Sequence, residues 1–364
     1  MKTLSKEKFF LREEGLTVLQ LNGSPLEMGL QHGSSLKEEI HLIRSKFIDY
    51  LSRRKWPVFG RILYWLLMVF AKTMNRYIPN LLRKEMLSVA KGANVPYCFI
   101  LLLNVLDDLL NLFFCSSFAI TKDGHIICGR NLDYDIFTDL MTHLNTVFVY
   151  KPKEGYPFLS LAWPGYVGCL TGMNVNGLVL TSHASYTFDR NRKGIPTGLL
   201  YRHALQHALC INDIDKAITS APRTIGNNVL LASDNEAFVL ELSAKNWKRR
   251  KSEGGIITIT NHYQTSAMKS IQAPFVSKPP GSSLPDDFFS YNHSILRDEQ
   301  LREFCKKESF WVNEAIEALR SEPVANGATA QSVVFLPSEK SIWVAKSLDA
   351  PVSLGKFIKL EGLL

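Results

Sequence analysis

The chain of 364 residues is 46% hydrophobic and 21% charged, a globular composition with enough length for one large core or two medium ones. Its first residues lack the apolar run of about 7 to 15 residues that a secretory signal peptide needs, so a cytoplasmic, reducing location is the default expectation. The six cysteines are widely spaced and form no C-x-x-C pair. We therefore expect free thiols, with no disulfide framework, metal site or cofactor.

The net charge of +8 is concentrated in one part of the chain. Residues 44–91 hold eleven Lys and Arg against two acidic residues. No P-loop, G-x-G-x-x-G or zinc-finger spacing accompanies them, so nucleic acid is not the expected partner. The apolar run within this region, residues 62–71, is shorter than the roughly 20 residues of a membrane span. It is either a buried core helix or an interfacial helix, through which residues 44–91 would associate peripherally with an anionic membrane.

Hydrophobic periodicity predicts the elements in chain order. Helices are expected over residues 34–53, 79–91, 98–114, 197–210, 214–220, 290–305 and 312–319. Strands are expected over residues 16–23, 117–121, 125–130, 146–150, 158–162, 167–173, 178–183, 228–232, 238–243, 256–260, 332–336 and 341–346. Because helices come first and many antiparallel strands follow with helices grouped between them, an α+β protein is predicted rather than βαβ units.

Cys115 stands where the predicted helices give way to strands. Asp123-Gly124, a hairpin turn signal, joins the two short strands that follow it. Taken alone, such a cysteine is more often a buried small hydrophobe than a nucleophile. Asp107 and Asp108 precede it on a predicted helix, where adjacent side chains do not face one another. At least one of these carboxylates is therefore expected to be solvated or to cap a helix.

Several motifs occur in an order that spans most of residues 20–345. They are Glu27–Gly33, Cys115 followed by small residues and a strand, Gly129–Asp133, Gly172–Leu178, Gly194–Pro196, Val239–Glu241 and Thr260–His262. In this order they resemble the N-terminal-nucleophile hydrolases, in particular the acyltransferase and choloylglycine hydrolase branches. These branches include isopenicillin N acyltransferase, penicillin V acylase, bile-salt hydrolases and, more distantly, acid ceramidase.

The resemblance implies a four-layer αββα sandwich with antiparallel sheets and an N-terminal helical segment. In this family the chain cuts itself before its nucleophile, here between Phe114 and Cys115. Residues 1–114 would then form the severed α chain, and residues 115–364 the catalytic β chain. The new α-amino group of Cys115 can act as the base for its own thiol, which removes the need for a histidine partner.

The resemblance also assigns roles to individual side chains. Cys115 would be the nucleophile, and Arg130 and Asp133 would orient its amino group and thiol. Asn261 looks like the oxyanion donor, and Arg297 resembles a supporting arginine late in the family. The residues expected to bind substrate are Asn174, His183, His262 and Trp65, although Asn174 is also what a tight turn demands.

The function implied is an autoprocessed cysteine amidohydrolase or acyltransferase. It would cleave a linear, non-peptide amide in a small N-acyl substrate through a thioester acyl-enzyme, and the basic, aromatic-rich stretch favours a lipid-like acyl group. Bile-salt hydrolases carry a second oxyanion asparagine where this chain has His183, which argues against bile salts. The alternative is an uncleaved peripheral membrane or lipid-binding protein with the same fold. A papain-like protease is disfavoured because the C-G-[SA]-C-[WY] context is missing.

Overall fold

The computed structural model describes residues 10–13, 15–52, 57–110, 113–274, 278, 282 and 284–364. Its strands are β1 (Phe10–Glu13), β2 (Leu16–Gly23), β3 (Phe113–Lys122), β4 (His125–Tyr134), β5 (Thr146–Pro152), β6 (Phe158–Ala162), β7 (Thr171–Asn174), β8 (Val179–Ala184), β9 (Asn227–Ala232), β10 (Ala237–Leu242), β11 (Trp247–Lys251), β12 (Ile256–Ile259), β13 (Thr329–Leu336), β14 (Ser341–Lys346) and β15 (Lys356–Leu360).

The α-helices are α1 (Pro25–Ser35), α2 (Lys37–Ser52), α3 (Pro57–Met74), α4 (Asn80–Ala93), α5 (Tyr97–Leu110), α6 (Thr138–His143), α7 (Thr197–His207), α8 (Ile211–Ser220), α9 (Ser266–Lys269), α10 (Tyr291–Cys305) and α11 (Val312–Arg320). Short 3-10 helices lie at η1 (Asn75–Tyr77), η2 (Asp286–Phe289), η3 (Pro337–Glu339) and η4 (Val352–Leu354).

The strands form two sheets. Across the described ranges, one sheet has nine strands in the order β1-β2-β5-β6-β7-β8-β9-β10-β11, and the other has six in the order β12-β3-β4-β13-β14-β15. Neighbouring strands run antiparallel, except that β2 and β5 are parallel. The Asp123-Gly124 turn joins β3 to β4 with positive φ at both residues, 49° and 78°, as a type I′ hairpin requires.

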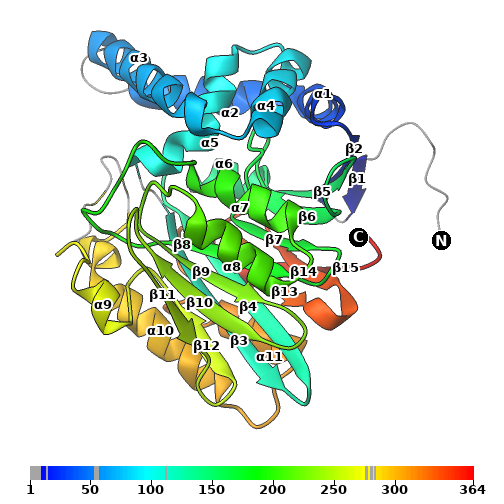
Figure 1. Cartoon of the computed structure of the whole chain (residues 1–364), viewed down its shortest axis with the longest axis vertical. Helices are drawn as coiled ribbons and strands as arrows, with labels where there is room; N and C mark the ends of the chain where they lie inside the picture. The colour runs from blue at the N-terminus through cyan, green and yellow to red at the C-terminus, as the bar shows by residue number, and fades with distance from the viewer. Residues whose placement is uncertain are drawn as a thin grey trace.

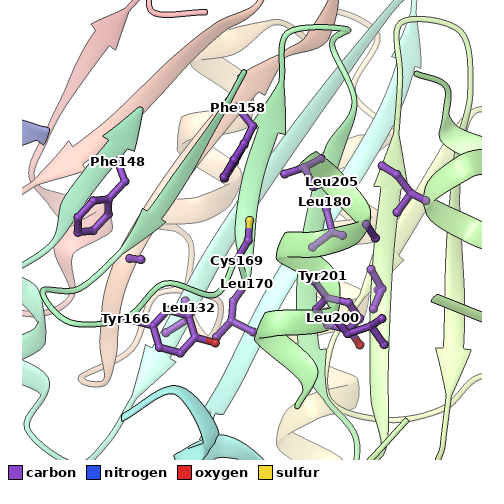
Figure 2. Close-up of a cluster of buried hydrophobic side chains, with 14 of the residues drawn as sticks. Leu132, Phe148, Phe158, Tyr166, Cys169, Leu170, Leu180, Leu200, Tyr201 and Leu205 are labelled. Atoms are coloured by element: carbon purple, nitrogen blue, oxygen red, sulfur yellow. The ribbon is translucent and has the colours of Figure 1, made fainter. Parts of the chain in front are cut away.

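Three apolar layers hold the sheets and helices together. Side chains such as Val149 and Val333 fill the space between the two sheets. On the outer face of the nine-stranded sheet, α7 and α8 cover a second layer that includes Phe158, Leu180 and Leu205 (Figure 2). On the outer face of the six-stranded sheet, α10 and α11 cover a third. The predicted αββα sandwich is confirmed by this packing.

The N-terminal helices gather at one end of the sheets (Figure 1). Helices α1 and α4 cross closely, because a Cβ at Gly29 or Gly33 would lie only 2.3 or 2.2 Å from a backbone carbonyl oxygen of α4. These two glycines belong to the Glu27–Gly33 motif. The motif therefore serves helix packing, and Ser24 and Glu27 begin α1 with a capping box.

The structure corrects several predicted boundaries. The helix expected over residues 34–53 is divided between α1 and α2. The helix expected to run to Phe114 ends at Leu110, and β3 has begun at Phe113 because Phe113 and Phe114 pair with Tyr134 and Asp133 of β4. The change from helix to strand thus precedes Cys115. Strands β1, β11 and β15, helix α6 and the parallel β2–β5 pair were not predicted, and Arg53 lies outside the described residues.

Candidate active site

Strand pairing in the six-stranded sheet brings the predicted site residues to Cys115. Strand β3 lies between β4 and β12, and Cys115 pairs with Leu132 of β4. On the other side Ile259, the last residue of β12, pairs with Ser117. Because β12 runs antiparallel to β3, the residues that follow Ile259 continue toward Cys115. Asn261 reaches it in this way.

Each polar group of Cys115 is in contact with a different side chain. Its backbone N–H donates to Asn261 Oδ1 at 2.9 Å. Arg130 Nη2 lies 3.3 Å from the thiol Sγ, and Arg297 Nη1 donates to the backbone carbonyl oxygen at 2.8 Å. Cys115 itself is fully buried. Three of the five predicted catalytic residues therefore touch the fourth, Cys115, directly.

Arg130 and Asp133 are fixed by contacts far along the chain. Arg130 donates to the carbonyl oxygens of Leu170 and Ser182, both at 2.6 Å. The carboxylate of Asp133 accepts from Thr329 Oγ1 at 2.8 Å and from Asn326 Nδ2 at 2.9 Å, and the side chains of Asp133 and Arg297 lie 3.7 Å apart. Sequence reasoning missed Asn326 and Thr329. The local sequence signal near them is Asn326-Gly327, which indicates a turn before the final hairpin but not a contact with Asp133.

Asn261 is held by a network of small polar groups. Its Oδ1 also accepts from Arg297 Nη2 at 2.9 Å, and its Nδ2 donates to the carbonyl oxygen of Ala184 at 2.8 Å. Its backbone N–H donates to Ser294 Oγ at 2.9 Å. Ser294 Oγ also lies 2.9 Å from Nδ1 of His262. The Asn261 amide is therefore fixed in orientation beside Cys115.

Burial dominates the ionisation of the site. It raises the pKa of the Cys115 thiol above its ordinary value, and the positive charge of Arg130 is the largest opposing influence. Burial also raises the pKa of Asp133, opposed first by Arg297, and lowers the pKa of Arg297, opposed first by Asp133. Burial therefore favours the neutral form of the Cys115 thiol.

The four predicted substrate-binding residues occupy different places. His183 is buried on β8, 2.8 Å from Ser117 Oγ, and burial lowers its pKa well below the ordinary value. His262 supports Ser294 at the site, and burial lowers its pKa as well. Asn174 Nδ2 donates to the carbonyl oxygens of Leu205 and Ala208, away from Cys115. Trp65 is 63% exposed on α3. A substrate contact stays a prediction for all four.

Asp107 and Asp108 are both buried. Asp108 accepts from the backbone N–H of Thr197 at 3.0 Å and from its hydroxyl at 3.0 Å, so it caps α7 from a distant part of the chain. Asp107 lines a cavity of about 50 Å³ with aromatic walls that include Tyr134, Trp163 and Tyr166. The expectation of one capping carboxylate is met, and neither side chain is solvated.

Helix α3 has one buried and one exposed apolar face. Leu67, Ala71 and Met74 are buried, whereas the outward residues are exposed by 37% or more: Ile62, Trp65, Leu66, Val69 and Phe70. In the described part of the chain no helix combines the length and apolar character that crossing a membrane requires. The same residues hold no group of three or more His, Cys, Asp or Glu arranged for a metal ion, and all six cysteines are free.

The chain is similar in sequence to several known proteins. The family model described as acyl-coenzyme A:6-aminopenicillanic acid acyl-transferase matches residues 120–292. Protein dcd1A of Dictyostelium discoideum is 26% identical over 239 residues, which cover 57% of this chain and 54% of that protein. The chain thus spans about half the length of that curated relative.

Two further relatives carry names that describe an activity. The acyl-coenzyme A:6-aminopenicillanic-acid-acyltransferase 40 kDa form of Emericella nidulans is 24% identical over 254 residues, 66% of this chain and 67% of that protein. Acid ceramidase of Rattus norvegicus is 29% identical over 132 residues, 32% of this chain and 33% of that protein. In motif order, in its two-sheet sandwich and in sequence, the chain is similar to the N-terminal-nucleophile hydrolases, with the acyl-transferase and acid ceramidase relatives among the matches.

Proposed function

We propose that this chain is a cysteine N-terminal-nucleophile amidohydrolase or acyltransferase that cuts its own backbone between Phe114 and Cys115. One observation carries the proposal. The amide nitrogen, the sulfur and the carbonyl oxygen of Cys115 each contact a separate polar side chain, from Asn261, Arg130 and Arg297. The backbone groups of any buried residue need partners, but a thiol that only fills a core needs no arginine beside it. The arrangement favours a residue whose nitrogen takes part in the chemistry together with its sulfur.

Self-cleavage needs no co-reactant except water. The Cys115 sulfur attacks the carbonyl carbon of Phe114, and the carbon–nitrogen bond breaks as the nitrogen takes the thiol proton. Water then hydrolyses the thioester, which leaves a carboxylate on Phe114 and restores the thiol. The former amide nitrogen is now an α-amino group, with an ordinary pKa of about 8. It can take the thiol proton in the next reaction and give it to the leaving amine of a substrate.

The surrounding charges suit the negative intermediates of this reaction. Arg130 lies closest to the sulfur and favours the thiolate that forms during attack. In the uncut chain Asn261 Oδ1 accepts from the Cys115 nitrogen, and the Nδ2 atom of the same amide is the proposed donor to the oxyanion. Loss of one such donor typically costs about 10² to 10³ in rate. Arg297 donates to both the Cys115 carbonyl oxygen and Asn261 Oδ1 and so fixes their relative position.

The substrate class proposed is an apolar, lipid-like N-acyl amide. The relatives include proteins named acid ceramidase, and the exposed apolar face of α3 lies within the basic residues 44–91. A helix with exposed Trp65 and Phe70 and flanking cations suits the interface of an anionic membrane. We propose that α3 brings the protein to such a surface, where apolar substrates collect.

The same helix supports a second candidate function. An uncleaved chain could use α3 and the basic region to bind membranes or lipids without any chemistry. The two functions differ in one respect that can be measured, because only the enzyme forms a covalent bond between Cys115 and an acyl group.

Detection of that bond tests the proposal. Purified protein is mixed with the decanoyl amide of 7-amino-4-methylcoumarin. The reaction is quenched in acid, the protein is digested, and the mass of the peptide that contains residue 115 is measured. We expect coumarin release and a decanoyl adduct that hydroxylamine removes, since thioesters are cleaved by it. Cys115→Ala should abolish both signals, while Cys128→Ala, a change at another buried cysteine, should leave them. No release and no adduct in the wild type would reject the enzyme, and vesicle binding by that inert protein would support the second function.

A further inference from the structure

The residue before the proposed cleavage point is enclosed by aromatic rings. Phe114 is only 3% exposed, and its ring centroid lies 5.1 Å from that of Phe288, 5.3 Å from that of Phe289 and 6.0 Å from that of Tyr186. The first two pairs meet edge to face, the favoured geometry for aromatic rings. We call Tyr186, Phe288 and Phe289 the Phe114 cage.

The cage comes from parts of the chain that remain on the catalytic side of the cleavage point. Phe288 and Phe289 form η2 just before α10, and Tyr186 follows β8. Tyr186 also adjoins the nucleophile, since burial and then the Cys115 thiol raise its pKa. Phe114 itself is the last residue of the proposed severed segment. Cleavage would therefore separate the occupant from the cage.

The chemistry of self-cleavage gives the cage a second use. In the processing thioester, which rests on the function proposed above, the acyl group on the Cys115 sulfur is the carbonyl of Phe114. In the thioester formed from a substrate, the acyl group on the same sulfur is that of the substrate. The Cα, Cβ and ring of Phe114 therefore mark one place where an acyl group fits when bound to this sulfur. Without the Phe114 nitrogen, the corresponding group is 3-phenylpropanoyl.

Cleavage also frees Phe114 to leave. The peptide bond to Cys115 holds its side chain in a cluster with Phe288, Phe289 and Ala328, with Tyr186 and Leu284 partly buried beside them, and hydrolysis removes that bond. The resulting chain end carries a carboxylate, which water solvates better than a buried site does. Departure of Phe114 toward water opens the cage.

We infer that the Phe114 cage is the acyl-binding subsite of the processed enzyme, and that it selects arylalkanoyl amides with a ring about two carbons from the carbonyl. The Cys115 sulfur forms a bond to that carbonyl carbon, the carbon–nitrogen bond breaks and the amine leaves with a proton. Water then releases the 3-arylpropanoate. Straight acyl chains, the decanoyl group included, fill the ring-lined cage less well and are therefore expected to react more slowly than 3-phenylpropanoyl.

The test compares acyl groups on one amine. The butanoyl, octanoyl and 3-phenylpropanoyl amides of 7-amino-4-methylcoumarin are hydrolysed by processed protein, and kcat/KM is measured for each. We expect 3-phenylpropanoyl to exceed both others by about tenfold or more, because a filled apolar pocket discriminates by about 10- to 200-fold per missing group. Phe289→Ala should lower the 3-phenylpropanoyl to butanoyl ratio about tenfold. Phe188→Ala, a change at a ring 77% exposed near Tyr186, should leave the ratio unchanged.

Each negative result of this comparison leads to a different conclusion. If all three amides are hydrolysed at similar kcat/KM, or if Phe289→Ala leaves the ratio intact, the subsite is rejected while the proposed enzyme stands. If the 3-phenylpropanoyl preference emerges only in Phe114→Ala, the severed Phe114 stays in the cage and the inference is wrong. If the protein neither cuts itself nor hydrolyses any amide, the proposed function fails, and the subsite fails with it.

Discussion

This molecule has two buried groups of charged side chains. Both combine arginine with a carboxylate, but the number of arginines per carboxylate differs. Where the N-terminal helices meet the nine-stranded sheet, Arg202 of α7 pairs with Glu85 of α4 at 3.1 Å. Its guanidinium carbon lies 3.9 and 4.4 Å from the ring centroids of Tyr150 and Phe158. At Cys115, by contrast, two arginines are accompanied by one carboxylate, that of Asp133, which lies 3.7 Å from Arg297, while Arg130 contacts the Cys115 sulfur and two backbone carbonyl oxygens.

The difference in net charge distinguishes an ion pair that stabilises the fold from a site where positive charge can stabilise an anion. Glu85 and Arg202 neutralise one another, so the pair joins the N-terminal helices to the nine-stranded sheet without a net charge. Arg130, Arg297 and Asp133 leave one positive charge in excess. A buried charge without a partner is costly, but such a charge stabilises a thiolate or an oxyanion when one forms. Changes at Glu85 and Arg130 test this contrast directly, and changes at Asp108, Asp107 and Trp65, outside both groups, have smaller expected effects.

Removal of only one partner of the Glu85–Arg202 pair should destabilise the fold. In the uncut Cys115→Ala background, Glu85→Ala leaves the Arg202 guanidinium buried without its carboxylate and should lower the free energy of unfolding by about 3 to 5 kcal/mol. Urea denaturation measures the change. The double change Glu85→Leu with Arg202→Met should recover most of the loss, because neither charge remains. A single variant within 1 kcal/mol of its parent would contradict the structural role.

The site should lose rate when positive charge is removed. Arg130→Met should slow self-cleavage about 10² to 10³-fold, a loss typical of one electrostatic donor to a developing anion. Intact mass, followed over time after synthesis or refolding, measures the rate. Arg130→Lys keeps the charge and should recover part of the rate. Cleavage of Arg130→Met at the wild-type rate would show that the excess charge has no part in the reaction.

The adjacent carboxylates of α5 should respond in opposite directions. Asp108→Ala removes the acceptor for Thr197 and Thr224 and should cost about 1 to 3 kcal/mol of unfolding free energy. Burial, followed by the charge of Asp108, raises the pKa of Asp107 well above its ordinary value. A raised carboxyl pKa stabilises the fold below the unfolded pKa of about 3.9 and loses that effect as pH rises.

Asp107→Asn should therefore be more stable than the parent at neutral pH. The gain should shrink as pH falls and vanish only below the unfolded pKa of about 3.9, where the Asp107 carboxyl is neutral in both the folded and the unfolded chain. Thermal unfolding over a pH series measures it. An Asp107→Asn protein that is less stable at pH 7 would show that the carboxylate has a stabilising partner.

The outward face of α3 belongs to neither group of charges. Trp65→Ser should change the free energy of unfolding by no more than about 0.5 kcal/mol, as surface changes usually do, and should leave self-cleavage intact. It should weaken binding to anionic vesicles in flotation, with Lys72→Ala as a control for charge alone. Equal flotation of wild type and Trp65→Ser would remove α3 from the proposed membrane contact.

The sequence predicted what depends on local pattern. Alternation and the Asp123-Gly124 turn predicted the β3–β4 hairpin, and the motif order drew attention to Arg130, Asp133 and Asn261 near Cys115. Helix α5 was predicted too long because Phe113 and Phe114 are as apolar as the helix before them. Only their pairing with β4 makes them strand residues.

Long-range contacts could not be predicted in the same way. Asn326 and Thr329 meet Asp133 across about two hundred residues, and no periodicity relates such distant positions. At least one of the Asp107 and Asp108 side chains was expected to be solvated or to cap a helix. Packing of α5 against α3, α4 and α7 buries both, since polar groups of α7 and its surroundings satisfy Asp108.

The central claim is that Cys115 becomes a new N-terminus. The intact mass of the purified wild-type chain under denaturing conditions tests it directly, with Cys115→Ala as the comparison. The account predicts two polypeptides whose masses match residues 1–114 and 115–364 for the wild type, and one uncut chain for Cys115→Ala. A wild-type protein that keeps the mass of the full chain, with no fragment that begins at Cys115, would contradict it.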